Sequence, residues 1–91
     1  MREQKKIRSL KMPYARQQTI YRTCQNYINL SKEKQEKIKR LCREVVRGND
    51  EDFRALFEVL TTEKSIRRIA FEHYMSEMKL YYLRKRFYES W

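Results

Sequence analysis

The chain has 91 residues, one Gly, one Pro and a formal net charge of +10. This length suits one domain, and the few helix breakers, without any period-two strand pattern, predict an all-α fold of about five helices. No apolar run is long enough for a transmembrane helix and the basic N-terminus lacks the apolar part of a signal peptide, so we expect a cytoplasmic protein.

The excess of basic residues indicates the class of partner. The chain holds 22 Lys and Arg against 12 Asp and Glu. Such a balance favours polyanions, namely duplex DNA, RNA or an anionic membrane surface, and does not choose among them. A membrane is the least favoured of the three, because the apolar stripes of the chain are expected to pack against one another.

Residues 1–12 are predicted to be a basic, flexible arm. They carry Arg2, Lys5, Lys6, Arg8 and Lys11, and they show no clear apolar face. A solvated tail is one interpretation. The other is an arm that lies along DNA phosphates or reaches into a minor groove.

Residues 13–48 are predicted to form a helical hairpin. The first helix begins at Pro13 and runs to near Leu30. Its stripe consists of Tyr14, Gln17, Ile20, Tyr21, Cys24, Tyr27 and Ile28. The second helix follows Ser31 and ends at Gly48, which suits a left-handed C-terminal cap. Its stripe consists of Ile38, Leu41, Cys42, Val45 and Val46. The short connections favour antiparallel neighbours.

Residues 49–91 are predicted to form a three-helix unit. Asn49 or Asp50 caps its first helix, and Ser65 and Ser76 precede the other two. The buried face of the first helix consists of Phe53, Leu56, Phe57 and Leu60. A block of about 40 residues is near the lower limit for independent folding, so residues 13–91 are expected to share one core.

The last two helices carry an informative spacing of small and hydrophobic residues. In a helix-turn-helix, a small residue lets two helices approach, a hydrophobic residue fills the turn, and two apolar residues three apart close the core. Residues of these types, the motif core, are Ile69, Ala70, Met75, Leu80 and Leu83. The stretch resembles the helix-turn-helix of DNA-binding proteins. More narrowly, it is similar to the C-terminal (region four) domain of sigma factors and to phage or mobile-element transcriptional regulators of the RinA and ArpU kind.

One residue departs from this pattern. Tyr74 stands where many helix-turn-helix proteins have Gly, for which a left-handed backbone costs little. Tyr74 therefore implies either a differently shaped turn or local strain.

The resemblance implies a sequence-specific DNA-binding transcriptional regulator with a recognition helix over about residues 77–88. The outward residues expected at base edges are Glu77, Met78, Tyr81, Tyr82 and Lys85. The residues expected at phosphates are Arg67, Arg68, Ser76, Lys79, Arg84 and Arg86. We expect a homodimer on double-stranded DNA with two half-sites, and RNA polymerase is a further candidate partner.

Two other functions remain open. One is binding of RNA or of a single strand, in which Tyr81 and Tyr82 would matter more than the lysines. The other is a protein-interaction or inhibitor module of a mobile element, which predicts an exposed apolar patch.

We do not expect an enzyme. The only glycine is Gly48, so a Gly-rich phosphate loop is absent. The only histidine, His73, is expected to pack at a helix end, and Cys24 and Cys42 are expected to be reduced core residues. Without a CxxC pair we expect no metal site, and no cofactor is predicted.

Overall fold

Ile7 and residues 10–91 are described by the computed structural model, and within them all regular structure is helical. The elements are α1 (Tyr14–Gln25), the 3-10 helix η1 (Tyr27–Asn29), α2 (Lys32–Val46), α3 (Asp50–Thr61), α4 (Ile66–Glu72) and α5 (Glu77–Ser90). The described part contains five α-helices and no strand, which confirms the predicted all-α fold.

Four helices begin where a polar side chain accepts a hydrogen bond from a backbone N–H three residues further on. These N-cap residues are Ser31, Asn49, Ser65 and Ser76. Each such cap satisfies one of the free N–H groups at a helix start and contributes about 1 kcal/mol. The helix starts are therefore determined locally, and of the two residues considered for α3 the cap is Asn49.

The end of α1 differs from the prediction. The helix stops at Gln25, and η1 turns the chain before α2 begins. Ile28 does not continue the buried stripe, because its side chain is 85% exposed. Gln25 instead donates hydrogen bonds from Nε2 to the carbonyl oxygens of Leu60 (2.9 Å) and Thr62 (3.0 Å) at the end of α3. These bonds satisfy terminal carbonyls of α3 and tie α1 to that helix.

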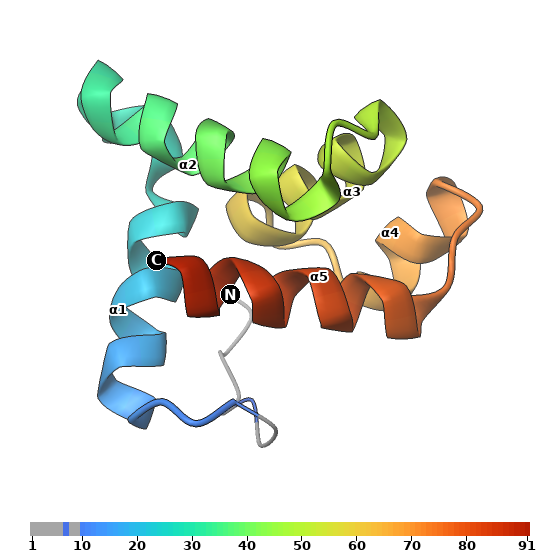
Figure 1. The fold of residues 1–91 in the computed structure, drawn as a ribbon, viewed down its shortest axis with the longest axis horizontal. Helices are drawn as coiled ribbons and strands as arrows, with labels where there is room; N and C mark the ends of the chain where they lie inside the picture. Colours follow the sequence, from blue (N-terminus) through green and yellow to red (C-terminus); the bar gives the residue numbers. More distant parts are fainter. Residues whose placement is uncertain (1–6, 8–9) are drawn as a thin grey trace.

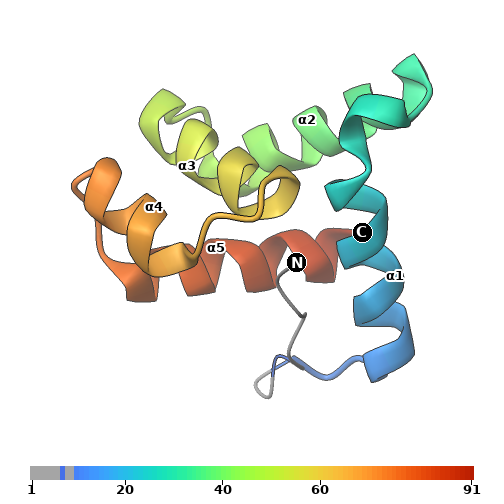
Figure 2. The ribbon, with the colours of Figure 1, turned by 180° about the vertical axis from the view of Figure 1, so that it is seen from behind.

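The first two helices are not arranged as the predicted antiparallel hairpin. α1 makes its main contacts with α3, whereas α2 packs on α3 and α5. α1 runs upright and α2 runs across the top of the molecule in both views (Figures 1 and 2). The change of direction at η1 is the physical cause of the difference.

The central element is α3, which contacts α1, α2, α4 and α5. Its inner face consists of Ala55, Leu56, Val59 and Leu60. Phe53 and Phe57, which were predicted to be buried, are only partly buried. Their rings stack with centroids 5.8 Å apart, and Tyr27 meets Phe57 edge-on at 4.9 Å. Side chains from all five α-helices join one buried cluster around α3.

Two residues of the predicted N-terminal arm lie in this core. Ile7 and Leu10 are 9% and 4% exposed. The backbone N–H of Ile7 donates to Oε1 of the fully buried Gln17 at 2.9 Å, and Nε2 of Gln17 donates to the carbonyl of Met12 at 3.1 Å. This arrangement differs from the solvated arm that the composition predicted. Residues 1–6 and 8–9 of that arm lie outside the described residues.

Both cysteines are buried and free, as predicted for reduced core residues. Burial raises the pKa of Cys24 and of Cys42 to about 12. Both thiols are therefore neutral near pH 7, and a neutral buried thiol is a poor nucleophile.

Candidate nucleic-acid interface

α4 and α5 are joined by residues 73–76 and pack against each other and against α3. The residues of the motif core lie on the inner side of this pair. Exposure is 0% for Ile69, 3% for Ala70, 0% for Leu80 and 5% for Leu83, and Met75 packs partly buried against the core. The small side chain of Ala70 leaves room at the junction, and its carbonyl accepts a hydrogen bond from the Met75 N–H at 2.9 Å.

The turn after α4 is left-handed at Tyr74, where φ is +54°. The Met75 N–H reaches back to Ala70, and the Tyr74 N–H donates to the carbonyl of Phe71 at 3.3 Å. Such a helix end normally carries Gly, because Cβ of an L-residue clashes in this conformation at a cost of about 1–2 kcal/mol. Tyr74 is 97% exposed, so packing of its ring recovers little of that cost. The sequence left open whether Tyr74 gives a differently shaped turn or local strain. The turn has the usual left-handed shape, so Tyr74 is locally strained.

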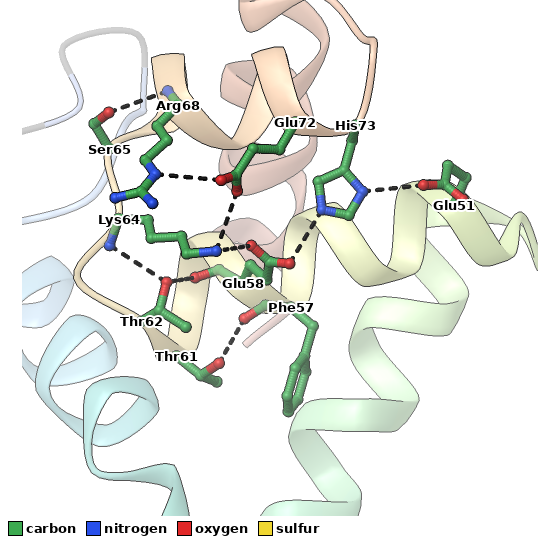
Figure 3. Close-up of polar contacts among 10 residues, drawn as sticks. All are labelled: Glu51, Phe57, Glu58, Thr61, Thr62, Lys64, Ser65, Arg68, Glu72 and His73. Atoms are coloured by element: carbon green, nitrogen blue, oxygen red, sulfur yellow. Dashed lines mark hydrogen bonds and ion pairs between the residues drawn. The ribbon is translucent and has the colours of Figure 1, made fainter.

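His73 closes α4 and fixes the turn to α3. Its Nδ1 lies 3.0 Å from Oε1 of Glu51 and its Nε2 lies 3.1 Å from Oε1 of Glu58 (Figure 3). Only 13% of the imidazole is exposed, in agreement with the expected half-buried residue at a helix end. The hydrogen bond with Glu51 raises the pKa of His73, with a further contribution from Glu58, while burial acts in the opposite direction. A protonated imidazole donates at both nitrogens, and thus to both carboxylates.

The network continues from Glu58 along α4. Nζ of Lys64 lies 3.5 Å from Oε2 of Glu58 and 3.1 Å from Oε1 of Glu72 (Figure 3). Nε of Arg68 lies 3.3 Å from the other oxygen of Glu72. The hydrogen bond with Lys64 lowers the pKa of Glu72, which keeps this carboxylate ionised. Arg68, a predicted phosphate contact, is therefore attached to a structural ion-pair network.

α5 buries one side and exposes the other. Its buried residues are Leu80, Leu83, Phe87 and Tyr88. Tyr88, which is 1% exposed, was not expected in the core, and Trp91 is only partly buried beneath Nζ of Lys37, 4.1 Å from the ring centroid. The spacing along α5 could not reveal Tyr88, because this residue lies about two turns after the exposed Tyr81 and about 80° around the helix from Leu80.

The residues predicted at base edges lie mainly on the exposed side of α5. Exposure is 79% for Met78, 48% for Tyr81 and 60% for Tyr82, while Lys85 is half-buried. Glu77 is exposed but differs in position. It lines a groove between α4 and α5, and the other lining residues are Ser65, Arg67, Arg68, Ala70, Phe71 and Met75. Glu77 is thus at the edge of the surface that the other four form.

The predicted phosphate contacts have different surroundings. Arg67 and Ser76 are exposed. Nζ of Lys79 pairs at 2.9 Å with Asp52, whose side chain is only 11% exposed, and this pair ties α5 to the start of α3. Arg86 pairs with Glu89 at 3.5 Å, and the guanidinium of Arg84 stacks 5.3 Å from the ring centroid of Tyr81.

Three apolar side chains at the α4–α5 corner face solvent. Phe71 at the end of α4 is 82% exposed, Tyr74 occupies the turn and Met78 opens α5. Phe71 was not singled out from the sequence. Its place in α4, on the side away from Ile66, Ile69 and Ala70, was the signal that could have found it.

Comparisons with known proteins found no matching family model, no matching curated protein and no matching solved structure. The resemblance to helix-turn-helix regulators therefore stays a prediction. Within the described ranges, no His, Cys, Asp or Glu side chains gather in a group of three or more that could hold a metal ion, and no helix has both the length and the apolar character to cross a membrane.

We predict that Tyr74→Gly raises the free energy of unfolding by about 1 kcal/mol, because Gly adopts the left-handed turn without strain. Urea unfolding followed by circular dichroism measures the change. Tyr74→Ala is the matched control: it removes the same exposed ring and keeps the strained Cβ, so it should stay near wild type. A Gly variant no more stable than the Ala variant would contradict the strain.

We predict that the stability contributed by His73 depends on pH. Its pKa is higher in the folded protein than the value of about 6.5 in the unfolded chain. The contribution is therefore complete below about pH 6.5 and is lost as the pH rises through the folded pKa. Wild type should be more stable than His73→Gln at about pH 5.5, with the difference shrinking by about pH 8.5. If the free energies of unfolding of wild type and His73→Gln changed in parallel with pH, His73 would not be the source of this pH dependence.

Proposed function

We propose that the protein is a sequence-specific regulator of transcription that binds double-stranded DNA by inserting α5 into the major groove. The observation that carries this proposal is the outer side of α5. Met78, Tyr81, Tyr82 and Lys85 lie on this side, whereas the opposite side of α5 packs against α3 and α4. A helix with its side chains is about 10–12 Å wide, which suits a major groove about 12 Å wide.

The chemistry of these side chains fits base recognition. Lys85 can donate to the guanine acceptors O6 and N7, and Met78 or a tyrosine ring can contact a thymine methyl group. Glu77 can accept from a cytosine amino group at the edge of the contact surface.

The charges around α5 support the same proposal. In the described part of the chain, neither Arg67 nor Lys85 lies within ion-pair distance of a carboxylate, so both can bind DNA without breaking a pair. Arg68 and Arg86 would exchange an exposed carboxylate for a phosphate, whereas Lys79 would approach a phosphate while it keeps its pair with the largely buried Asp52. Arg67 and Ser76 would add phosphate contacts at the starts of α4 and α5. The net charge of +10 adds attraction to any nucleic acid.

A homodimer belongs to this proposal. One recognition helix reads few base pairs, and two copies on a two-part site multiply the discrimination. RNA polymerase stays a further candidate partner of a transcriptional regulator bound in this way.

A second function is favoured by a specific observation. Phe71, Tyr74 and Met78 are all exposed at the α4–α5 corner, and exposed apolar side chains are what a protein-interaction module of a mobile element predicts. Met78 belongs to the proposed DNA surface, and Phe71 and Tyr74 lie at its edge, so the two functions differ in the partner that they predict.

The proposal predicts that selection from a random duplex library enriches one sequence, which binds far more tightly than scrambled DNA. Lys85→Ala should weaken binding to the selected site by about 1–3 kcal/mol and relax the base preference at one position of that site. Arg67→Ala should weaken binding to all duplexes about equally and reduce the slope of log affinity against log salt concentration by about 1. Fluorescence anisotropy at two salt concentrations measures both effects.

The controls separate the alternatives. Lys32→Gln removes one exposed charge at the far end of α2 and should leave the preference for the selected site unchanged. Equal weak binding of all duplexes that vanishes with salt would reject sequence-specific recognition. If duplex binding is negligible and Phe71→Ser abolishes capture of a specific protein, the interaction module is the function.

A further inference from the structure

The surroundings of α5 differ between its two flanks. Residues nine apart in a helix point about 180° away from each other, so Glu77 and Arg86 mark opposite flanks. Glu77 borders the groove toward α4. Arg86 borders a second groove, formed with the end of α2 and the start of α3, whose lining includes Arg47, Asp52 and Tyr82. α4 therefore lies beside one flank of α5, and the α2–α3 turn lies beside the other.

The α2–α3 turn contains a strained arginine. Arg47 adopts a left-handed backbone with φ of +53° and is followed by Gly48, also left-handed at φ +79°. The left-handed cap of α2, which the sequence predicted at Gly48, therefore already begins at Arg47, an L-residue for which this conformation is unfavourable. The Arg47 side chain is exposed, and among the described residues it pairs with no carboxylate. Nothing in the fold explains an arginine in place of Gly or Asn at this position.

The two acids that line this groove are each paired with another cation. Glu44 lies 3.9 Å from Nε of Arg40, and Asp52 is paired with Lys79. Arg86, across the groove, is paired with Glu89 on its own helix. Arg47 therefore adds a positive charge that is not paired with either of these acids to the flank of α5 that α4 does not cover.

We propose that Arg47 binds a backbone phosphate of the DNA strand on the flank of α5 opposite α4. This inference rests on the proposed insertion of α5 into the major groove. A groove has a phosphate backbone on each side, so a helix lying in it needs a positioning contact on both flanks. Arg67 supplies a contact from α4, and Arg47 joins Arg86 on the other flank with a planar guanidinium that suits phosphate.

The inference is tested with Arg47→Gly, which removes the side chain and relieves the left-handed strain. The variant should melt at a higher temperature than wild type and yet bind the selected duplex about tenfold more weakly, with a salt slope smaller by about 1. Arg47→Lys keeps both the charge and the strain and should stay closer to wild type in affinity. The control Lys32→Gln removes an equal charge about 22 Å away along α2 and should leave affinity within twofold.

Phosphate ethylation interference identifies the strand. Wild type should show interference on both strands across the contacted groove. Arg47→Gly should lose it at one phosphate, and Arg67→Ala should lose it on the opposite strand. Loss on the same strand in both variants, or unchanged binding by Arg47→Gly, would overturn the inference.

The outcomes also separate this inference from the proposed function. If wild type prefers no duplex, both are rejected. If wild type is specific and Lys85→Ala weakens it while Arg47→Gly does not, α5 is the reading helix and the phosphate contact of Arg47 alone is rejected.

Discussion

The orientation of α5 depends on its attachment to α3. Leu80, Leu83 and Phe87 supply the buried area, which by itself allows a helix to slide or rotate over a hydrophobic surface. The polar contacts are directional: Asp52 holds Lys79 at the start of α5, and two carboxylates of α3 hold His73 before it. Because α3 also contacts α1 and α2, the exposed side of α5 is set by the whole core.

Both turns beside α5 contain an L-residue in a left-handed conformation. Tyr74 leads into the helix, and Arg47 lies at its flank. Each side chain is exposed, so packing does not offset the backbone strain. Strain of this kind concentrates at functional sites, where the side chain serves contacts outside the fold. The apolar ring of Tyr74 and the cation of Arg47 differ in chemistry, so the two turns expose different kinds of side chain to solvent.

Local patterns predicted the helix starts and, apart from Tyr88, the inner face of α4 and α5. A serine or asparagine caps its own helix, and Ala70, Leu80 and Leu83 recur at helical spacing, so neighbouring residues carry the information. The same patterns failed at α1. Tyr27 and Ile28 continue the apolar spacing of α1, yet the helix ends at Gln25. The side chain of Gln25 donates hydrogen bonds to the end of α3, which is distant in the sequence. Ile7 and Leu10 likewise lie in the core, where Gln17 binds the backbone of Ile7 and Met12. The stripe of the first helix included Gln17 but could not show what it binds.

The sequence by itself determined the all-α class, the N-terminal caps and most of the residues that α5 exposes, because each follows from chemistry within a few helical turns. Only the tertiary structure decided which exposed cations are already paired, which acids surround His73 and what lies on each flank of α5. Lys79 and Asp52 are 27 positions apart, and Arg47 lies far from Arg86 in the chain. Such pairs come together only when packing around α3 places their helices, and periodicity within one helix carries no information about another.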